Sequence, residues 1–124
     1  MHNSVPLRRM KSYTGAQGYV YQYYFVGQRP ALPSEPLGPA TEYIFDVSSD
    51  RKLTFAVSVF LRQEAARSWE GVHGRSLTEA ERYGAVKMRL FQAFDEIENL
   101  MAAGRRLALD GPGLEQALAE LGIA

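Results

Sequence analysis

The order of sequence patterns along the chain predicts an α+β fold. Period-two alternation of apolar and aromatic residues, typical of β-strands, is confined to the first half, and apolar residues at helical spacing occupy the second half. Strands followed by helices indicate an antiparallel sheet covered by helices on one side. We therefore expect one domain, residues 1–124, with a three-stranded antiparallel sheet packed against one long and one or two short helices.

The N-terminal part is predicted to contain a tail, a turn and the first strand. Residues 1–12 are expected to form a flexible tail, and the glycines of 12–18 indicate a turn. Segment 19–26 is rich in tyrosine, valine and phenylalanine, the residues that suit a strand. Alternation then places four aromatic side chains on one face of this strand: Tyr19, Tyr21, Tyr23 and Phe25.

A proline-rich segment, residues 27–40, follows the first strand. Its prolines stand at positions 30, 33, 36 and 39, a spacing of three that matches the three residues per turn of polyproline II. Such a segment is either a ligand for a proline-binding groove or a stiff connector between strands. We favour the connector.

The next two alternating runs predict a β-hairpin. Residues 41–47 and 53–61 alternate apolar side chains with polar or small ones, most clearly in the second run. Between them, Ser48, Ser49 and Asp50 supply side chains that favour turns.

Everything after Arg62 is predicted to be helical, with one ambiguous segment. A short helix follows the hairpin, and Gly71 or Gly74 is expected to end it. Thr78 and Glu81 form a capping box that begins a long helix, which we expect to run to about residue 103, about 39 Å. Residues 105–109 are a connector or a short strand, and a last helix carries the apolar residues Leu114, Ala117, Leu118 and Leu121.

Composition excludes several kinds of chemistry. The chain has no cysteine, which rules out disulfides, thiol nucleophiles and iron–sulfur clusters. No apolar run approaches the roughly 20 residues that span a bilayer, and the N-terminal residues lack the apolar stretch of a signal peptide. We expect a cytoplasmic protein without a membrane partner.

No sequence motif indicates a catalytic, metal or cofactor site. The two histidines, His2 and His73, have no metal-ligand spacing, and no phosphate-binding glycine loop follows a strand. We therefore expect no cofactor and a binding function rather than catalysis. The remaining enzymatic or small-ligand hypothesis requires a pocket between the sheet and the long helix, lined by Asp46, Tyr43 or His73.

The aromatic first strand is the predicted contact surface for another protein. Tyrosine combines a large apolar ring with a hydroxyl, which suits both protein cores and interfaces. We expect this strand to lie at a sheet edge or against another chain, either a second copy, giving a homodimer, or a different protein. The predicted partner-binding residues are Tyr19, Tyr21, Tyr23, Phe25, Pro30 and Pro33.

Charge distribution supports an alternative, the binding of single-stranded nucleic acid or another anion. The net charge is zero, but residues 1–34 contain no acid, and their four basic residues are the candidate anion ligands: Arg8, Arg9, Lys11 and Arg29. Tyrosines on a sheet can stack bases while such side chains contact phosphates. The pI of about 6.7 argues against this alternative, since nucleic-acid-binding domains are usually basic.

Overall fold

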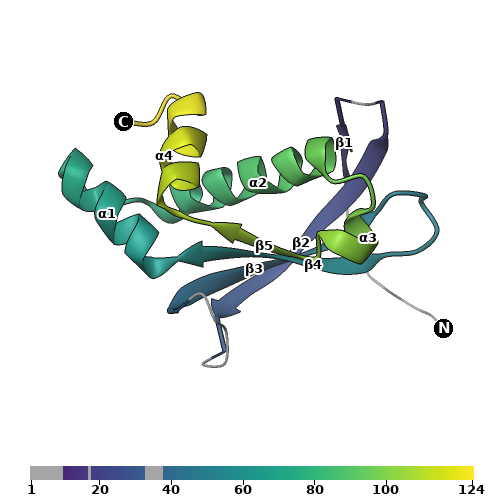
Figure 1. Cartoon of the computed structure of the whole chain (residues 1–124), viewed down its shortest axis with the longest axis horizontal. Helices are drawn as coiled ribbons and strands as arrows, with labels where there is room; N and C mark the ends of the chain where they lie inside the picture. The colour runs from purple at the N-terminus through teal and green to yellow at the C-terminus, as the bar shows by residue number, and fades with distance from the viewer. Residues whose placement is uncertain (1–9, 17, 33–37) are drawn as a thin grey trace.

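A five-stranded mixed sheet and four helices form the α+β fold of this chain in the computed structural model, which describes residues 10–16, 18–32 and 38–124 (Figure 1). The strands are β1 (Lys11–Thr14), β2 (Val20–Pro30), β3 (Ala40–Ser48), β4 (Phe55–Arg62) and β5 (Arg106–Leu109). The helices are α1 (Gln63–His73), α2 (Glu79–Glu96), α3 (Leu100–Ala103) and α4 (Gly111–Glu120). The predicted α+β class is confirmed, whereas the predicted three-stranded antiparallel sheet is wrong.

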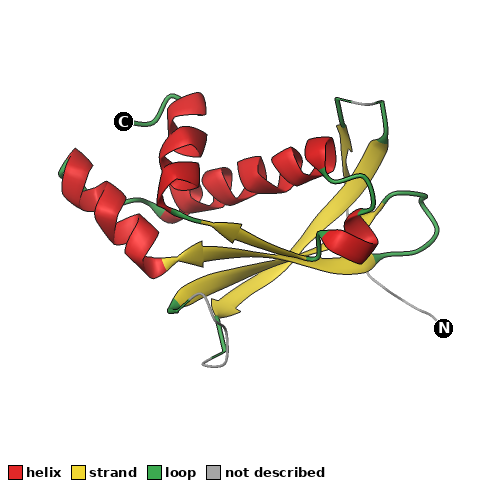
Figure 2. Cartoon of the chain, viewed as in Figure 1, coloured by secondary structure: helices red, strands yellow, loops and turns green. Residues whose placement is uncertain are grey.

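The strands lie in sequence order across the sheet. The first four form an antiparallel meander, and β5 pairs in parallel with β4 after the chain has passed through α1, α2 and α3 (Figure 2). A parallel pair requires such a crossover connection, which explains why the last strand is separated from the others by helices. The predicted hairpin is confirmed as β3 and β4, and the Asp50 side chain accepts hydrogen bonds from the backbone of Lys52 (2.8 Å) and Leu53 (3.0 Å) in its turn.

The N-terminal prediction missed a strand. Residues assigned to the tail and turn form β1, which pairs with β2, so that Tyr13 lies opposite Tyr21. The aromatic strand β2 therefore has neighbours on both sides, and its predicted position at the sheet edge is wrong. It also extends to Pro30, into the predicted proline connector, after a bulge between Phe25 and Gly27. A strand of four residues is too short to give a clear period-two signal.

The end of α1 and the start of α2 were predicted correctly, whereas the end of α2 and the start of α3 were not. α1 ends at His73 with Gly74 in the left-handed conformation, φ 70°, and α2 begins with the expected capping box of Thr78 and Glu81. However, α2 ends at Glu96 instead of continuing to residue 103. Asn99 caps the separate helix α3 by accepting a hydrogen bond from the Ala102 N–H at 3.2 Å. Of the two alternatives for residues 105–109, the short strand is correct.

One hydrophobic core lies between the helices and one face of the sheet, which we call the helix face. All four helices contribute buried side chains to it, including Trp69 from α1, Leu90 from α2, Leu100 from α3 and Leu118 from α4. The sheet contributes Tyr21, Tyr23, Tyr43, Phe45, Val47, Phe55, Val57, Val59, Leu61, Leu107 and Leu109. Within the described ranges, no helix is long and apolar enough to cross a membrane.

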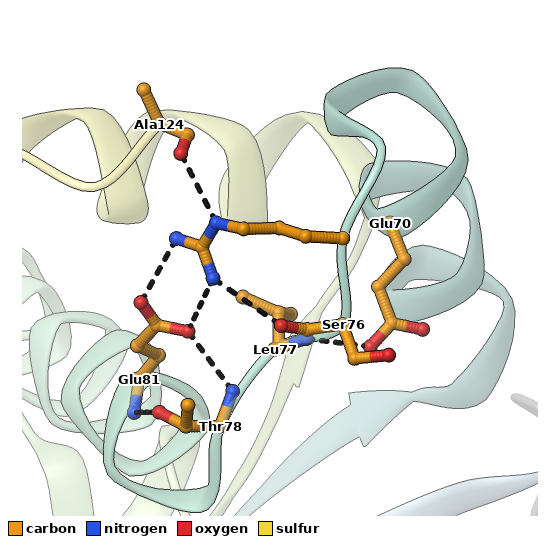
Figure 3. Close-up of polar contacts among 7 residues, drawn as sticks. Glu70, Ser76, Leu77, Thr78, Glu81 and Ala124 are labelled. Atoms are coloured by element: carbon orange, nitrogen blue, oxygen red, sulfur yellow. Dashed lines mark hydrogen bonds and ion pairs between the residues drawn. The ribbon is translucent and has the colours of Figure 1, made fainter.

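Hydrogen bonds of Arg75 fix the connection between α1 and α2, and Figure 3 labels their acceptors Glu81 and Ala124. Its guanidinium donates hydrogen bonds to both carboxylate oxygens of Glu81, at 3.0 and 2.9 Å, and to the Ala124 carbonyl at 3.3 Å. Across the same turn, the Glu70 carboxylate accepts from the Leu77 N–H at 2.7 Å. The same Glu81 side chain closes the capping box, so the ion pair and the start of α2 depend on one residue.

Candidate interaction surface

Two of the predicted contact residues belong to the protein's own core. Tyr21 is 4% exposed and Tyr23 is 6% exposed, and both rings lie on the helix face. The Tyr21 ring stacks on Phe94 of α2 with centroids 4.4 Å apart. Burial raises the pKa of both phenols. These rings are therefore sheltered by α2, and the expectation that they are covered by another molecule is wrong.

The remaining predicted contact residues are not gathered on one patch. Phe25 is half-buried against Tyr83 of α2, with centroids 4.9 Å apart. Tyr19 precedes β2 and is 58% exposed, and Pro30 is exposed at the other end of the same strand. Pro33 lies outside the described residues. Of this set, Tyr19 and Pro30 are available for contacts.

The predicted anion ligands are also separated. Arg8 and Arg9 lie outside the described residues. Lys11 begins β1 on the helix face, whereas Arg29 lies on the opposite face, which we call the helix-free face. The Arg29 guanidinium donates to Glu42 on the neighbouring strand at 2.9 Å, so an acid already balances its charge. Anion binding by these residues stays a prediction.

Glu42 is the centre of a polar cluster on the helix-free face. Besides Arg29, it accepts a 2.6 Å hydrogen bond from the Ser58 hydroxyl, and Arg106 lies over the adjacent, fully buried Phe60 ring at 4.8 Å. Burial acts to raise the pKa of Glu42, but the bonds from Ser58 and Arg29 and the nearby positive charges hold this pKa below its ordinary value. The cluster joins strands β2, β3, β4 and β5 and is best explained as part of the fold.

The pocket required by the enzymatic hypothesis does not assemble from the predicted residues. Tyr43 lies on the helix face and Asp46 on the helix-free face, because they are separated by an odd number of positions on β3. His73 on α1 lies 3.1 Å from Glu115 on α4. Over the described part of the chain, no group of three His, Cys, Asp or Glu residues is placed to hold a metal ion.

A groove lies elsewhere, on the outer side of α2. It measures about 530 Å³ and is bounded by α2, α4 and the Tyr13 side chain of β1. A second groove of about 300 Å³ lies where β2, β3 and β4 approach the start of α1. Neither is lined by Asp46, Tyr43 or His73.

The outer edge of β1 offers unpaired backbone groups. The Gly15 N–H donates to the Tyr19 carbonyl at 2.8 Å, which makes Gly15 and Tyr19 a hydrogen-bonded pair. Because such pairs alternate along an antiparallel ladder, Tyr13 and Lys11 direct their backbone groups toward β2, and Ser12 and Thr14 direct theirs outward. No described residue forms a hydrogen bond with these outward groups.

At the opposite edge of the sheet, a side chain occupies one outward carbonyl of β5. The Ser58 N–H of β4 donates to the Arg105 carbonyl at 2.8 Å, and the alternation of the parallel ladder then directs the Ala108 carbonyl away from β4. Arg89 of α2 donates from Nε to that carbonyl at 3.0 Å. Natural proteins commonly cover or charge an edge strand to prevent pairing with other chains. In this protein the Arg89 side chain covers the Ala108 carbonyl of β5.

Contacts with α2 hold β1 in place. The Tyr13 ring stacks on Phe91 of α2 with centroids 4.5 Å apart, and its hydroxyl donates to Asp95 Oδ2 at 2.9 Å. Asp95 Oδ1 accepts from the Ala16 N–H at 2.8 Å. Burial, followed by the bond to the Asp95 carboxylate, raises the pKa of Tyr13. A preformed edge costs less conformational entropy on binding than a disordered strand does.

Sequence reasoning missed this site because β1 was read as a tail and a turn. The one usable signal was the alternation of Lys11, Ser12, Tyr13 and Thr14 before a glycine-containing turn, since short strands joined by such turns form hairpins. No known protein family, curated protein or solved structure matches this chain.

Proposed function

We propose that this chain is a non-enzymatic protein-interaction module that self-associates by pairing the outer edge of β1 with the same edge of a second copy. The observation that carries the proposal is the row of outward backbone groups on β1. Ser12 and Thr14 present groups there that are bonded to no described residue, whereas at the β5 edge Arg89 occupies the Ala108 carbonyl. Addition of a strand to such an edge is a common mode of protein recognition.

A two-fold arrangement suits this edge. Ser12 and Thr14 each present one N–H and one carbonyl, so two copies related by a two-fold axis satisfy each other's groups. The start of β2 and the residue before it also expose apolar surface, since Val20 is 40% and Tyr19 is 58% exposed. Tyr19 keeps its predicted contact role in this proposal, and the buried Tyr21 and Tyr23 take no part.

The test is sedimentation equilibrium of the full chain and two Ser12 variants over a wide concentration range. Ser12→Pro removes the outward N–H, and proline is tolerated on edge strands where that N–H is not needed by the ladder. Ser12→Ala changes the side chain but keeps the N–H, so it is the matched control. We expect a dimer for the wild type and for Ser12→Ala.

For Ser12→Pro we expect a dissociation constant raised by about fivefold or more, because a symmetric dimer loses two hydrogen bonds of about 0.5–1.5 kcal/mol each. Circular dichroism must show that the variant is folded. A wild type that stays monomeric at its highest soluble concentration contradicts the proposal. A folded Ser12→Pro variant that dimerises like Ser12→Ala does so as well.

A further inference from the structure

We infer that Lys11 of each copy forms an ion pair with Asp95 of the other across the paired β1 edges, and that this ion pair selects the pairing register. The inference rests on the proposed self-association. It names the side chains that would favour a second copy of this chain over another exposed strand as the partner.

The register follows from the outward groups of β1. Hydrogen-bonded pairing of Ser12 with Thr14 of the second copy uses both outward residues of each strand and places the two Tyr13 residues opposite each other. In that register Lys11 lies opposite Gly15 of the second copy. Facing residues on the same side of an antiparallel pair have Cβ atoms about 5 Å apart, within easy reach of a lysine side chain.

The Asp95 carboxylate lies close to Gly15, on the side from which a side chain at this position would extend. A Cβ atom added to Gly15 would stand 3.3 Å from Asp95 Oδ1. The carboxylate is held there by the Tyr13 hydroxyl and the Ala16 N–H, each bonded to a different oxygen. An ionised carboxylate has about four acceptor sites, so two bonds leave room for an ammonium group. Asp95 is therefore both fixed and able to receive Lys11 of the second copy.

Lys11 forms no ion pair with an acid among the residues that the structure describes. It is exposed on the helix-face side of β1. Its charged neighbour is Lys87 of α2. Burial, followed by the positive charge of Lys11, lowers the pKa of Lys87. The second copy would give Lys11 an acidic partner and would offset the repulsion between the two lysines.

Other registers do not produce this contact. A slip by two residues in one direction would place Lys11 opposite Tyr13, and a slip in the other would carry it past Gly15 into the turn. A slip by one residue would bring side chains of the two opposite sheet faces together. The ion pair forms twice in the symmetric dimer. Its contribution to the free energy of dimerisation is therefore twice that of a single pair.

The experiment is a double-mutant cycle measured by sedimentation equilibrium at low and high salt, using the wild type, Lys11→Gln, Asp95→Asn and the double variant. In Asp95→Asn the amide oxygen can accept from the Ala16 N–H and the amide NH2 can donate to the Tyr13 hydroxyl oxygen, so both contacts can be kept without the charge. Exposed ion pairs contribute modestly, and two of them correspond to an effect between about twofold and thirtyfold on the dissociation constant. We expect each single variant to weaken the dimer by a factor in this range.

We expect the effects of the two substitutions to be coupled. The double variant should dimerise no more weakly than either single variant, and the difference in dissociation constant between each variant and the wild type should shrink at high salt. Arg67→Gln removes the same charge from an exposed position on α1 and serves as the matched control, with no change expected. Circular dichroism of each variant separates a lost contact from a lost fold.

The outcomes distinguish the inference from the proposed function. If the wild type dimerises, Ser12→Pro weakens the dimer, and Lys11→Gln and Asp95→Asn act additively or not at all, the ion pair is refuted while edge pairing stands. If the wild type is monomeric, or if its dimer is indifferent to Ser12→Pro, edge pairing itself is refuted and the ion pair with it.

Discussion

The substitution Tyr21→Ala tests whether the tyrosine strand belongs to the core of one chain. Tyr21 is 4% exposed and stacks on Phe94 at 4.4 Å, so its loss leaves a cavity beneath α2. Truncating a buried aromatic ring costs about 3–5 kcal/mol, which includes the lost apolar burial and the cavity. Native domains have free energies of unfolding of only about 5–15 kcal/mol, so Tyr21→Ala should keep a small positive free energy of unfolding. Tyr19→Ala, two positions away at a 58% exposed site, should change stability by less than about 0.5 kcal/mol.

The measurement is urea unfolding followed by circular dichroism, with all variants at one protein concentration because dimerisation would otherwise shift the midpoint. At about 4 °C per kcal/mol for a domain of this size, Tyr21→Ala should also lower the melting temperature by roughly 12–20 °C. Two results would refute the reasoning. Either Tyr21→Ala unfolds like the wild type, or Tyr19→Ala is as damaging as Tyr21→Ala.

Two further predictions concern acid stability and the protected sheet edge. The bonds from Arg75, ahead of all other causes, lower the pKa of Glu81 from 4.5 to about 2. Because the folded pKa is depressed, the stabilisation is present above about pH 4.5 and is lost as the pH falls toward 2. The stability difference between wild type and Glu81→Gln, which keeps the capping box, should therefore shrink on acidification, and urea midpoints that differ equally at neutral pH and about pH 3 would contradict this. Arg89→Ala frees the Ala108 carbonyl and leaves both edges open, so sedimentation velocity should show species larger than the dimer. A size distribution like that of the control Arg67→Ala would count against a guarding role for Arg89.

Capping and turn chemistry were the parts of the fold most readily predicted from sequence. Thr78 and Glu81 begin α2 where expected, and Gly74 ends α1, because these signals depend only on neighbouring residues. The end of α2 was misplaced because its apolar stripe continues through Ile97 and Met101 into α3. Asn99 interrupts the helix by capping the next one, a local signal that was outweighed by the longer periodic pattern.

The candidate site was harder to predict than the fold because it depends on which strands are neighbours. The aromatic alternation of β2 correctly indicated a strand and placed Tyr21 and Tyr23 on the same face, but alternation is the same for an internal strand and an edge strand. Because Lys11–Thr14 pairs with that strand, β1 is the edge of the sheet and β2 is internal. Tyr21 and Tyr23 lie beneath α2. The sequence therefore predicted the contact surface on β2, the strand next to β1.

By itself the sequence determined the α+β class, the β3–β4 hairpin, the end of α1 and the start of α2, since these follow from periodicity and capping between residues close in the chain. Tertiary structure decided the number of strands, the edge that stays open and the position of Asp95 beside Gly15, 80 residues away along the chain. Short strands gain their stability from pairing and packing with distant segments rather than from local preference, so their existence and their exposed edges are settled only when the whole sheet forms.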